Sequence, residues 1–254
     1  ISVDEDGNET KTLTNCEILV PMVAGFEYTN LYIFNDTLYF TTPNTEKDST
    51  GSIRFDLTDI YAVSLNGGKV NRLVKALSLN SSSDIKFSFI NNFVYITYLR
   101  DNSLYVTKVN AKKAVKTNLI AKNVQSFVIN ESEDENSNYV YYARAINENE
   151  NNLTGNVLAK YNFVTEKETI LKRDNFNTYS VKRVINGKIY YTRINSLYST
   201  AYIYSKNLED FDVNEETQYT VVAYSSNQYV FDVVGYTPGV IVSENNKIGR
   251  ASCR

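Results

Sequence analysis

Hydrophobic residues along this 254-residue chain fall into short runs closed by turn residues, and one type of run recurs four times. Each copy begins at a turn residue, continues into a hydrophobic run centred on tyrosine, and ends in threonine or alanine. The copies span residues 35–41, 91–97, 137–143 and 186–192, with central residues Tyr39, Tyr95, Tyr141 and Tyr190. Successive tyrosines are about 50 residues apart, which is the length of one β-propeller blade.

Each copy is predicted to be the second strand of a hairpin. Another hydrophobic run ends at the same turn in every repeat, as 181–185 does before Asn186-Gly187, the dipeptide most typical of a two-residue hairpin. A third and a fourth strand-like segment follow, such as 104–109 and 118–120 in the second repeat. Four short antiparallel strands per repeat form the plan of a propeller blade.

The central runs are apolar on consecutive residues, as in Phe93-Val94-Tyr95-Ile96, so both faces of these strands must be covered. A propeller covers both, because each blade lies between two neighbours, whereas a two-sheet sandwich buries one face of each sheet. The sequence therefore predicts an all-β fold, a β-propeller of four-stranded antiparallel blades. We expect four repeats and part of a fifth, at 28–80, 81–122, 123–174, 175–224 and 225–247.

One segment also fits a helix. Val70, Leu73, Val74 and Leu77 lie at the i, i+3, i+4 and i+7 positions of a helical face. The segment has only about ten residues, which is too short for a stable helix without good caps. We predict an outer strand and its connection.

The two ends differ from the repeats. Residues 1–27 are predicted to be a polar linker and a lead-in strand, and any secretion signal is expected upstream of Ile1. Residues 248–254 resemble a translated sequencing adapter. They are predicted to be a non-native tail that packs against nothing, and the propeller is expected to be truncated there.

Composition excludes several kinds of chemistry. The chain has 21 tyrosines and 12 phenylalanines, which favour strands, and it has no histidine. Without histidine it cannot form a Ser-His-Asp or Cys-His system or a His-ligated zinc site. The net charge is −3 and basic residues are spread among acids, so we do not expect a nucleic-acid partner. No cofactor is expected either, and Asn66-Gly67-Gly68 lacks the Lys-Ser/Thr continuation of a phosphate-binding loop.

The two cysteines do not predict a disulfide framework. Cys253 lies in the predicted non-native tail, which leaves Cys16 alone. Cys16 follows Leu13, Thr14 and Asn15 at a spacing similar to a lipoprotein acylation site, but the polar residues before it favour a plain thiol. Membrane association is expected only through an N-terminal anchor preceding this sequence.

One acidic segment has the alternation of a calcium loop. Asp210, Asp212, Asn214 and Glu216 are candidate metal ligands at the spacing of an EF-hand. Glu215 replaces the glycine that such a loop requires, and its twelfth position is not glutamate. A solvated loop is therefore favoured, and no residue is predicted to be catalytic.

The segments 181–192 and 104–110 resemble the blades of TolB-like and related bacterial propellers of unknown function. In those blades a turn precedes Ile-Tyr-Tyr, and a Leu-Tyr strand ends in a turn. The resemblance covers about residues 28–247. It implies an extracytoplasmic or cell-surface location and a binding role, and it transfers no functional residues.

Three functional hypotheses follow. The first is a non-catalytic binding or scaffold propeller at the bacterial cell surface, with a protein, peptide or carbohydrate ligand. The second is a glycan hydrolase that uses loop carboxylates at the propeller axis. The third is a regulatory propeller attached to a catalytic domain outside this sequence. Carboxylates converging on the axis would favour the second.

Overall fold

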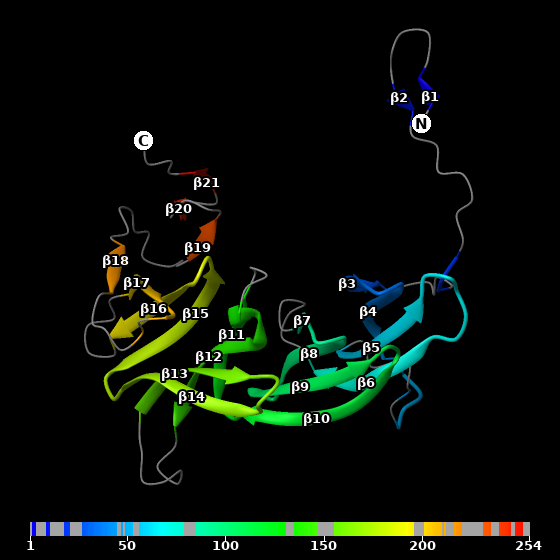
Figure 1. The fold of residues 1–254 in the computed structure, drawn as a ribbon, viewed down its shortest axis with the longest axis horizontal. Coiled ribbons are helices and arrows are strands. Elements are labelled where there is room, and N and C mark those ends of the chain that lie inside the picture. Colours follow the sequence, from blue (N-terminus) through cyan, green and yellow to red (C-terminus); the bar gives the residue numbers. More distant parts are fainter. Residues whose placement is uncertain are drawn as a thin grey trace. The chain divides into compact units, whose positions relative to one another are not determined.

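In the computed structural model, the regular secondary structure of the described residues is almost entirely β-strand (Figure 1). The structure describes residues 2–3, 9–10, 18–20, 27–44, 47, 49–52, 56–78, 85–130, 135–146, 155–195, 201–209, 211, 216–219, 231–234, 239–244 and 247–250. Within these residues the one helical element is the single 3-10 turn η2 (Glu135–Asn138). No helix in this part of the chain has the length and hydrophobicity needed to cross a membrane.

Four sheets have four strands each, and in every sheet the strands are paired in the order in which they occur in the chain. We name these sheets blades 1 to 4. Blade 1 contains β3 (Thr29–Phe34), β4 (Thr37–Pro43), β5 (Leu57–Ser64) and β6 (Asn71–Ser78), and blade 2 contains β7 (Ile85–Ile90), β8 (Phe93–Arg100), β9 (Ser103–Asn110) and β10 (Lys113–Ala121). Blade 3 contains β11 (Val124–Ile129), β12 (Tyr139–Ile146), β13 (Gly155–Asn162) and β14 (Lys167–Asp174), and blade 4 contains β15 (Asn177–Ile185), β16 (Lys188–Asn195), β17 (Ala201–Asn207) and β18 (Thr217–Tyr219).

Two smaller sheets lie outside the four blades. β1 (Ser2–Val3) pairs with β2 (Glu9–Thr10), and β19 (Phe231–Val234), β20 (Gly239–Glu244) and β21 (Lys247–Arg250) form a three-stranded sheet. The predicted fold class, an all-β propeller built from four-stranded antiparallel blades, is confirmed. Of the segment with helical spacing, Leu73, Val74 and Leu77 lie in β6 and Val70 directly precedes it, so the predicted outer strand is also confirmed there.

Asparagine and aspartate provide the tight turns of the hairpins. Both residues of four two-residue turns have positive φ, the geometry of a type I′ turn, which matches the right-handed twist of the flanking strands. These turns are Asn35-Asp36, Asn91-Asn92, Asp101-Asn102 and Asn186-Gly187. Asparagine, aspartate and glycine adopt this conformation at low cost, so the repeated turn residues of the sequence determine where each hairpin reverses.

The chain divides into two compact units. The first comprises Ile1–Leu77 and Ala111–Lys113, and the second comprises Ser78–Asn110 and Ala114–Arg254. Blade 1 is the main sheet of the first unit, and its Tyr39 and Phe40 are buried side chains. The Tyr39 hydroxyl donates a hydrogen bond of 2.7 Å to the carbonyl oxygen of Ala111. Burial, with a smaller contribution from Tyr32, raises the pKa of Tyr39 to about 12, so this hydroxyl remains a donor at neutral pH.

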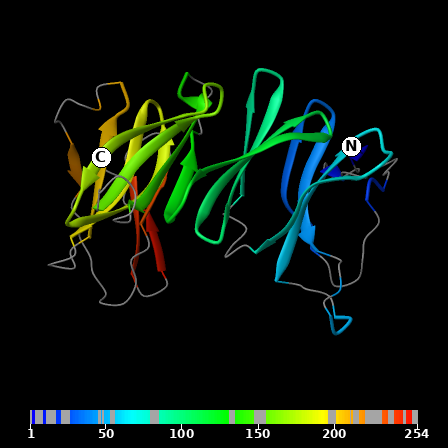
Figure 2. The same cartoon turned by 90° about the horizontal axis from the view of Figure 1, so that it is seen from below.

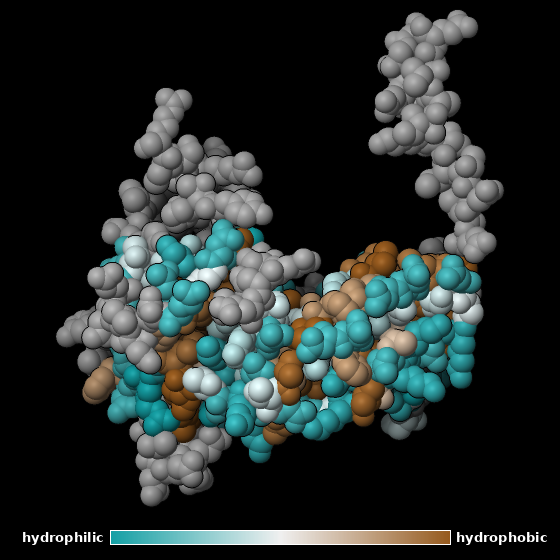
Figure 3. Space-filling view, in the orientation of Figure 1, coloured by the Kyte–Doolittle hydropathy of each residue, from teal (hydrophilic) through white to brown (hydrophobic). Residues whose placement is uncertain are grey.

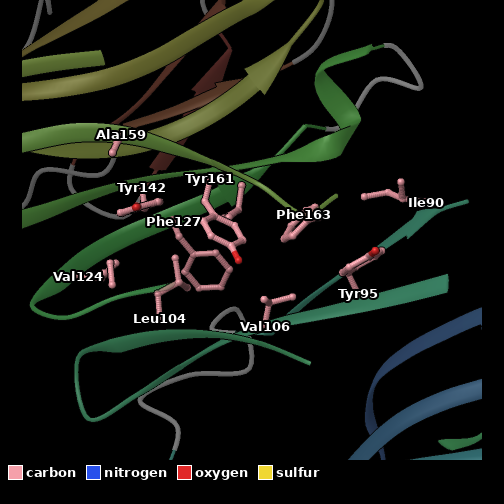
Figure 4. Packing of buried hydrophobic residues seen from close by; sticks show 12 residues of the cluster. Ile90, Tyr95, Leu104, Val106, Val124, Phe127, Tyr142, Ala159, Tyr161 and Phe163 are labelled. Atoms are coloured by element: carbon pink, nitrogen blue, oxygen red, sulfur yellow. The ribbon is translucent and has the colours of Figure 1, made fainter. Parts of the chain in front are cut away.

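In the second unit, blades 2, 3 and 4 stack face to face (Figure 2). One buried cluster joins blades 2 and 3, and Figure 4 shows Tyr95 of β8 approaching Phe163 and Tyr161 near the end of β13. The Tyr95 and Phe163 rings are stacked with centroids 5.2 Å apart. Because successive strand residues point to opposite faces, Tyr142 packs toward blade 2 while Tyr141 packs toward blade 4.

The first strands of blades 3 and 4 also contact each other directly. The backbone N–H of Val181 donates to Ser126 Oγ at 2.8 Å, and Asn130 forms a parallel bridge with Val184. Blade 3 is therefore covered on both faces, as the consecutive hydrophobic residues of its second strand require.

The C-terminal segment differs from the expected isolated tail. Ile248 pairs with Ser243 and Arg250 pairs with Ile241, so residues 248–250 continue a hairpin rather than contacting nothing. Such pairing is available to any chain that supplies backbone donors and acceptors. The non-native origin of this segment stays a prediction, as do the repeat boundaries. Cys253 and Cys16 lie outside the described residues.

Candidate functional site

Glu216 is the centre of a polar cluster between blades 3 and 4. It precedes β18 and accepts hydrogen bonds from the Tyr191 hydroxyl and the Lys172 ammonium group. Arg193 Nη1 lies 3.2 Å from the second carboxylate oxygen of Glu216. Tyr191 and Arg193 belong to β16 of blade 4, whereas Lys172 belongs to β14 of blade 3. The carboxylate therefore connects two neighbouring blades.

The protonation states of this cluster are determined by its own contacts. Burial acts to raise the pKa of Glu216, but hydrogen bonds from Lys172 and Tyr191 and the charges of Lys172 and Arg193 outweigh it, so that pKa is lowered. Burial, followed by the hydrogen bond to Glu216, raises the pKa of Tyr191. At neutral pH the carboxylate stays ionised and the phenol stays protonated. Neither group is suited to exchanging a proton near pH 7.

A second cluster of the same design lies in blade 3. The Tyr142 hydroxyl donates to Glu168 Oε1 at 2.5 Å, and Arg144 Nε lies 3.2 Å from the same oxygen. Tyr142 is on β12 and Glu168 is on β14, so the tyrosine reaches across β13, where its register partner is Ala159. Burial, followed by the hydrogen bond to Glu168, raises the pKa of Tyr142. The small alanine leaves room for the tyrosine ring.

The two clusters occupy equivalent places in the repeat. Tyr142 and Tyr191 each follow the central tyrosine of their repeat by one residue, and Arg144 and Arg193 follow it by three. This Tyr-x-Arg motif on the second strand is the signal that the sequence analysis missed. Blade 2 has isoleucine and tyrosine at these two positions, and blade 1 has phenylalanine and threonine.

Blade 1 buries a carboxylate in a different way. The side chain of Asp59 is fully buried on β5, where it accepts hydrogen bonds from Asn44 Nδ2 at 2.7 Å and from the Tyr61 hydroxyl at 3.0 Å. Arg72 Nη1 of β6 lies 3.5 Å away. These groups all come from blade 1 and the segment next to it, so this cluster holds one sheet together.

The predicted calcium ligands are only partly visible. Asp210, Asp212 and Asn214 lie outside the described residues, and the carboxylate of Glu216 is bound by Lys172, Tyr191 and Arg193. Among the residues that the structure describes, no group of three or more acidic, cysteine or histidine side chains is placed to hold a metal ion. The calcium loop stays a prediction.

The outer strands of blades 2 and 3 expose apolar side chains. The exposed fractions are 59% for Val115 and 46% for Leu119 on β10, and 43% for Ile170 on β14. Figure 3 shows separate apolar patches among hydrophilic side chains on the face in view. A ligand could meet apolar side chains on these surfaces without displacing core residues. Leu31 and Ile33 on β3, and Phe176, are also exposed.

Comparisons with known proteins concern the fold alone. No family model and no curated protein matches the sequence. A prolyl endopeptidase structure aligns with a TM-score of 0.54 and 7% identity over 85% of this chain and 32% of its own. The apocarotenoid oxygenase of Synechocystis aligns with a TM-score of 0.47 and 10% identity over 77% of this chain and 53% of its own. A chain of a nidogen/laminin complex gives a TM-score of 0.44 and 12% identity over 82% and 67%.

The chain thus spans about half the length of the oxygenase and a third of the endopeptidase. The finer resemblance to TolB-like propellers stays a prediction. What the sheets and the similarity to the endopeptidase establish together is that the described chain has the fold of propeller blades.

Proposed function

We propose that this chain is a non-catalytic binding or scaffold propeller of the bacterial cell surface. One observation carries the proposal: the carboxylates of Asp59, Glu168 and Glu216 are each paired with a cationic side chain and a tyrosine hydroxyl. Carboxylates held in this way stabilise sheets and their contacts. They are poorly suited to act as the free acid and base of glycan hydrolysis, which needs one protonated and one ionised carboxyl group across a cleft.

The ligand class follows from charge and scaffold. A net charge of −3 does not favour nucleic acid, so a protein, peptide or carbohydrate ligand is proposed. Stacked sheets with short turns form a rigid support on which edges and loops can bind such a ligand with little loss of conformational entropy. The cell-surface location is proposed from the resemblance to TolB-like propellers.

A paired assay tests binding against catalysis. The purified chain is sedimented with isolated bacterial cell envelopes at increasing concentration, and in parallel it is incubated with a panel of soluble polysaccharides while reducing ends are measured. Saturable sedimentation without release of reducing ends is expected, and the heat-unfolded chain provides the control. Release of reducing ends above that control would contradict the proposal and favour the hydrolase.

A further inference from the structure

The outer strand β10 has an unpaired edge. In the strand order β10-β9-β8-β7, β10 is at one edge of blade 2, and among the described residues its sheet partner is β9 alone. The edge of a sheet carries backbone N–H and C=O groups that can pair with another extended chain. β10 has nine residues, enough for a full additional strand.

The side chains of β10 form an apolar row on one face. Leu119 lies four positions after Val115, so the two side chains project from the same face of the strand. Both are substantially exposed, and most of β10 is exposed, with Ala121 its one buried residue. An added strand would cover these side chains and remove apolar surface from water.

The segment around β10 is basic in an acidic chain. From residue 102 to residue 130 there is no aspartate, glutamate or arginine, and the lysines are Lys108, Lys112, Lys113, Lys116 and Lys122. Lys122 is exposed. Lys116 pairs with Glu166 at 2.7 Å, but both side chains are about half exposed, so water screens the pair and another carboxylate can replace Glu166.

We propose that β10, from residue 114 to its end, binds an extended, acidic peptide segment of a partner protein by β-strand addition. The backbone edge supplies the hydrogen bonds, Val115 and Leu119 contact apolar side chains, and Lys116 and Lys122 attract the acidic ones. This inference rests on the proposed binding function, for which it names the partner class and the surface.

The outer strand of blade 3 provides a matched control. β14 is also the last strand of its sheet, and Ile170 is exposed almost as much as Leu119. Its charges are mixed, because Glu168 and Asp174 lie among its basic residues and Lys172 is bound by Glu216. The same acidic peptide should therefore bind β14 poorly.

Fluorescence anisotropy with synthetic peptides tests the inference. The probe is a labelled peptide in which glutamate and valine alternate. It has about eight residues, which is slightly longer than an average strand. Two comparison peptides replace glutamate with lysine or carry N-methyl groups on alternate backbone amides. The acidic peptide is expected to bind, and N-methylation is expected to weaken binding about tenfold because it removes backbone donors.

Matched variants locate the binding surface. Leu119→Ser and Lys122→Gln are each expected to weaken binding several-fold, whereas Ile170→Ser and Lys167→Gln on β14 should leave it unchanged. Circular dichroism melting checks that all four variants fold. Equal effects of the β10 and β14 variants, or equal binding of the N-methylated peptide, would overturn the inference.

Two further outcomes separate this inference from the proposed function. If no acidic peptide binds but the chain still sediments with envelopes, strand addition at β10 is wrong and the binding function stands. Concentration-dependent self-association that is lost in Leu119→Ser would identify a second copy as the occupant of the edge and would contradict the partner proposed. Release of reducing ends from polysaccharides would instead contradict the proposed function.

Discussion

The Glu216 cluster and the Asp59 cluster bury the same chemical group in two ways. Glu216 is bound by Lys172 of the neighbouring blade, whereas Asn44, Tyr61 and Arg72, which contact Asp59, come from its own blade and the segment beside it. The ionic contact of Glu216 with Lys172 therefore depends on the stacking of blades 3 and 4. These three contacts of Asp59 depend on the register of one sheet. Substitution of Glu216 can thus test blade stacking, whereas substitution of Asp59 can test the register of one sheet.

The largest expected effect comes from removing the carboxylate that joins two blades. Glu216→Leu leaves Lys172 and Arg193, both about three-quarters buried, without their counter-charge. The free energy of unfolding is expected to fall by about 2–3 kcal/mol, since an unpaired cation is left in a partly buried place. Urea unfolding followed by tyrosine fluorescence measures it. A loss no larger than that of an exposed control, Glu166→Leu, would contradict the account.

A smaller loss is expected in blade 1. Asp59→Asn keeps a polar side chain of the same shape in a fully buried position, but it removes the charge that faces Arg72 and replaces an acceptor oxygen with a donor. The free energy of unfolding is expected to fall by about 1–2 kcal/mol. A larger loss in free energy of unfolding for Asp59→Asn than for Glu216→Leu would contradict the predicted order of the two effects.

Replacing a cationic partner is expected to lower the free energy of unfolding least, and the loss should be smallest in blade 1. Arg72 has a side chain 40% exposed and contacts Asp59 at 3.5 Å, and the hydrogen bonds from Asn44 and Tyr61 to the buried carboxylate remain without it. Arg72→Met is therefore expected to cost about 1 kcal/mol. Arg193→Met should cost more, because Arg193 also donates to the Tyr204 hydroxyl at 2.6 Å. Chemical unfolding of the two variants under the same conditions gives the comparison.

Acid should weaken the contact of Glu216 selectively. Its pKa in the folded chain is lowered from the ordinary 4.5, so its contribution to stability is present above that value and is lost as the pH falls through the lower folded value. The melting temperature is therefore expected to fall more steeply between neutral pH and pH about 3 in the parent chain than in Glu216→Gln. Parallel curves for the two proteins would show that Glu216 is not held ionised.

Local patterns predicted the strands, because turn chemistry and hydrophobic runs act over a few residues. Asn91-Asn92 and Asn186-Gly187 form hairpin turns because these residue types tolerate positive φ. The same property allowed the turns to be predicted from the sequence. The consecutive hydrophobic residues of the central runs also predicted coverage of both faces. In the third run, Tyr141 and Tyr142 belong to two different buried clusters.

Such local patterns could not predict the contacts of the polar clusters. Glu216 matched a calcium loop by its spacing from Asp212 and Asn214, but its contacts come from Lys172 and Tyr191, 44 and 25 residues away. Glu168 similarly meets Tyr142 across an intervening strand. Contacts of this kind follow from sheet register and blade stacking, which spacing along the chain does not encode. The recurrence of Tyr-x-Arg would have indicated the positions, though not the partner.

A double-mutant cycle on Lys172 and Glu216 tests most directly whether the largely buried carboxylate of Glu216 holds blades 3 and 4 together. The free energy of unfolding is measured for Lys172→Met, Glu216→Gln, the double variant and the parent chain. A coupling of about 1–2 kcal/mol is predicted, against less than about 0.5 kcal/mol for the exposed pair Lys116 and Glu166. Equal coupling in the two pairs, or none between Lys172 and Glu216, would contradict the account.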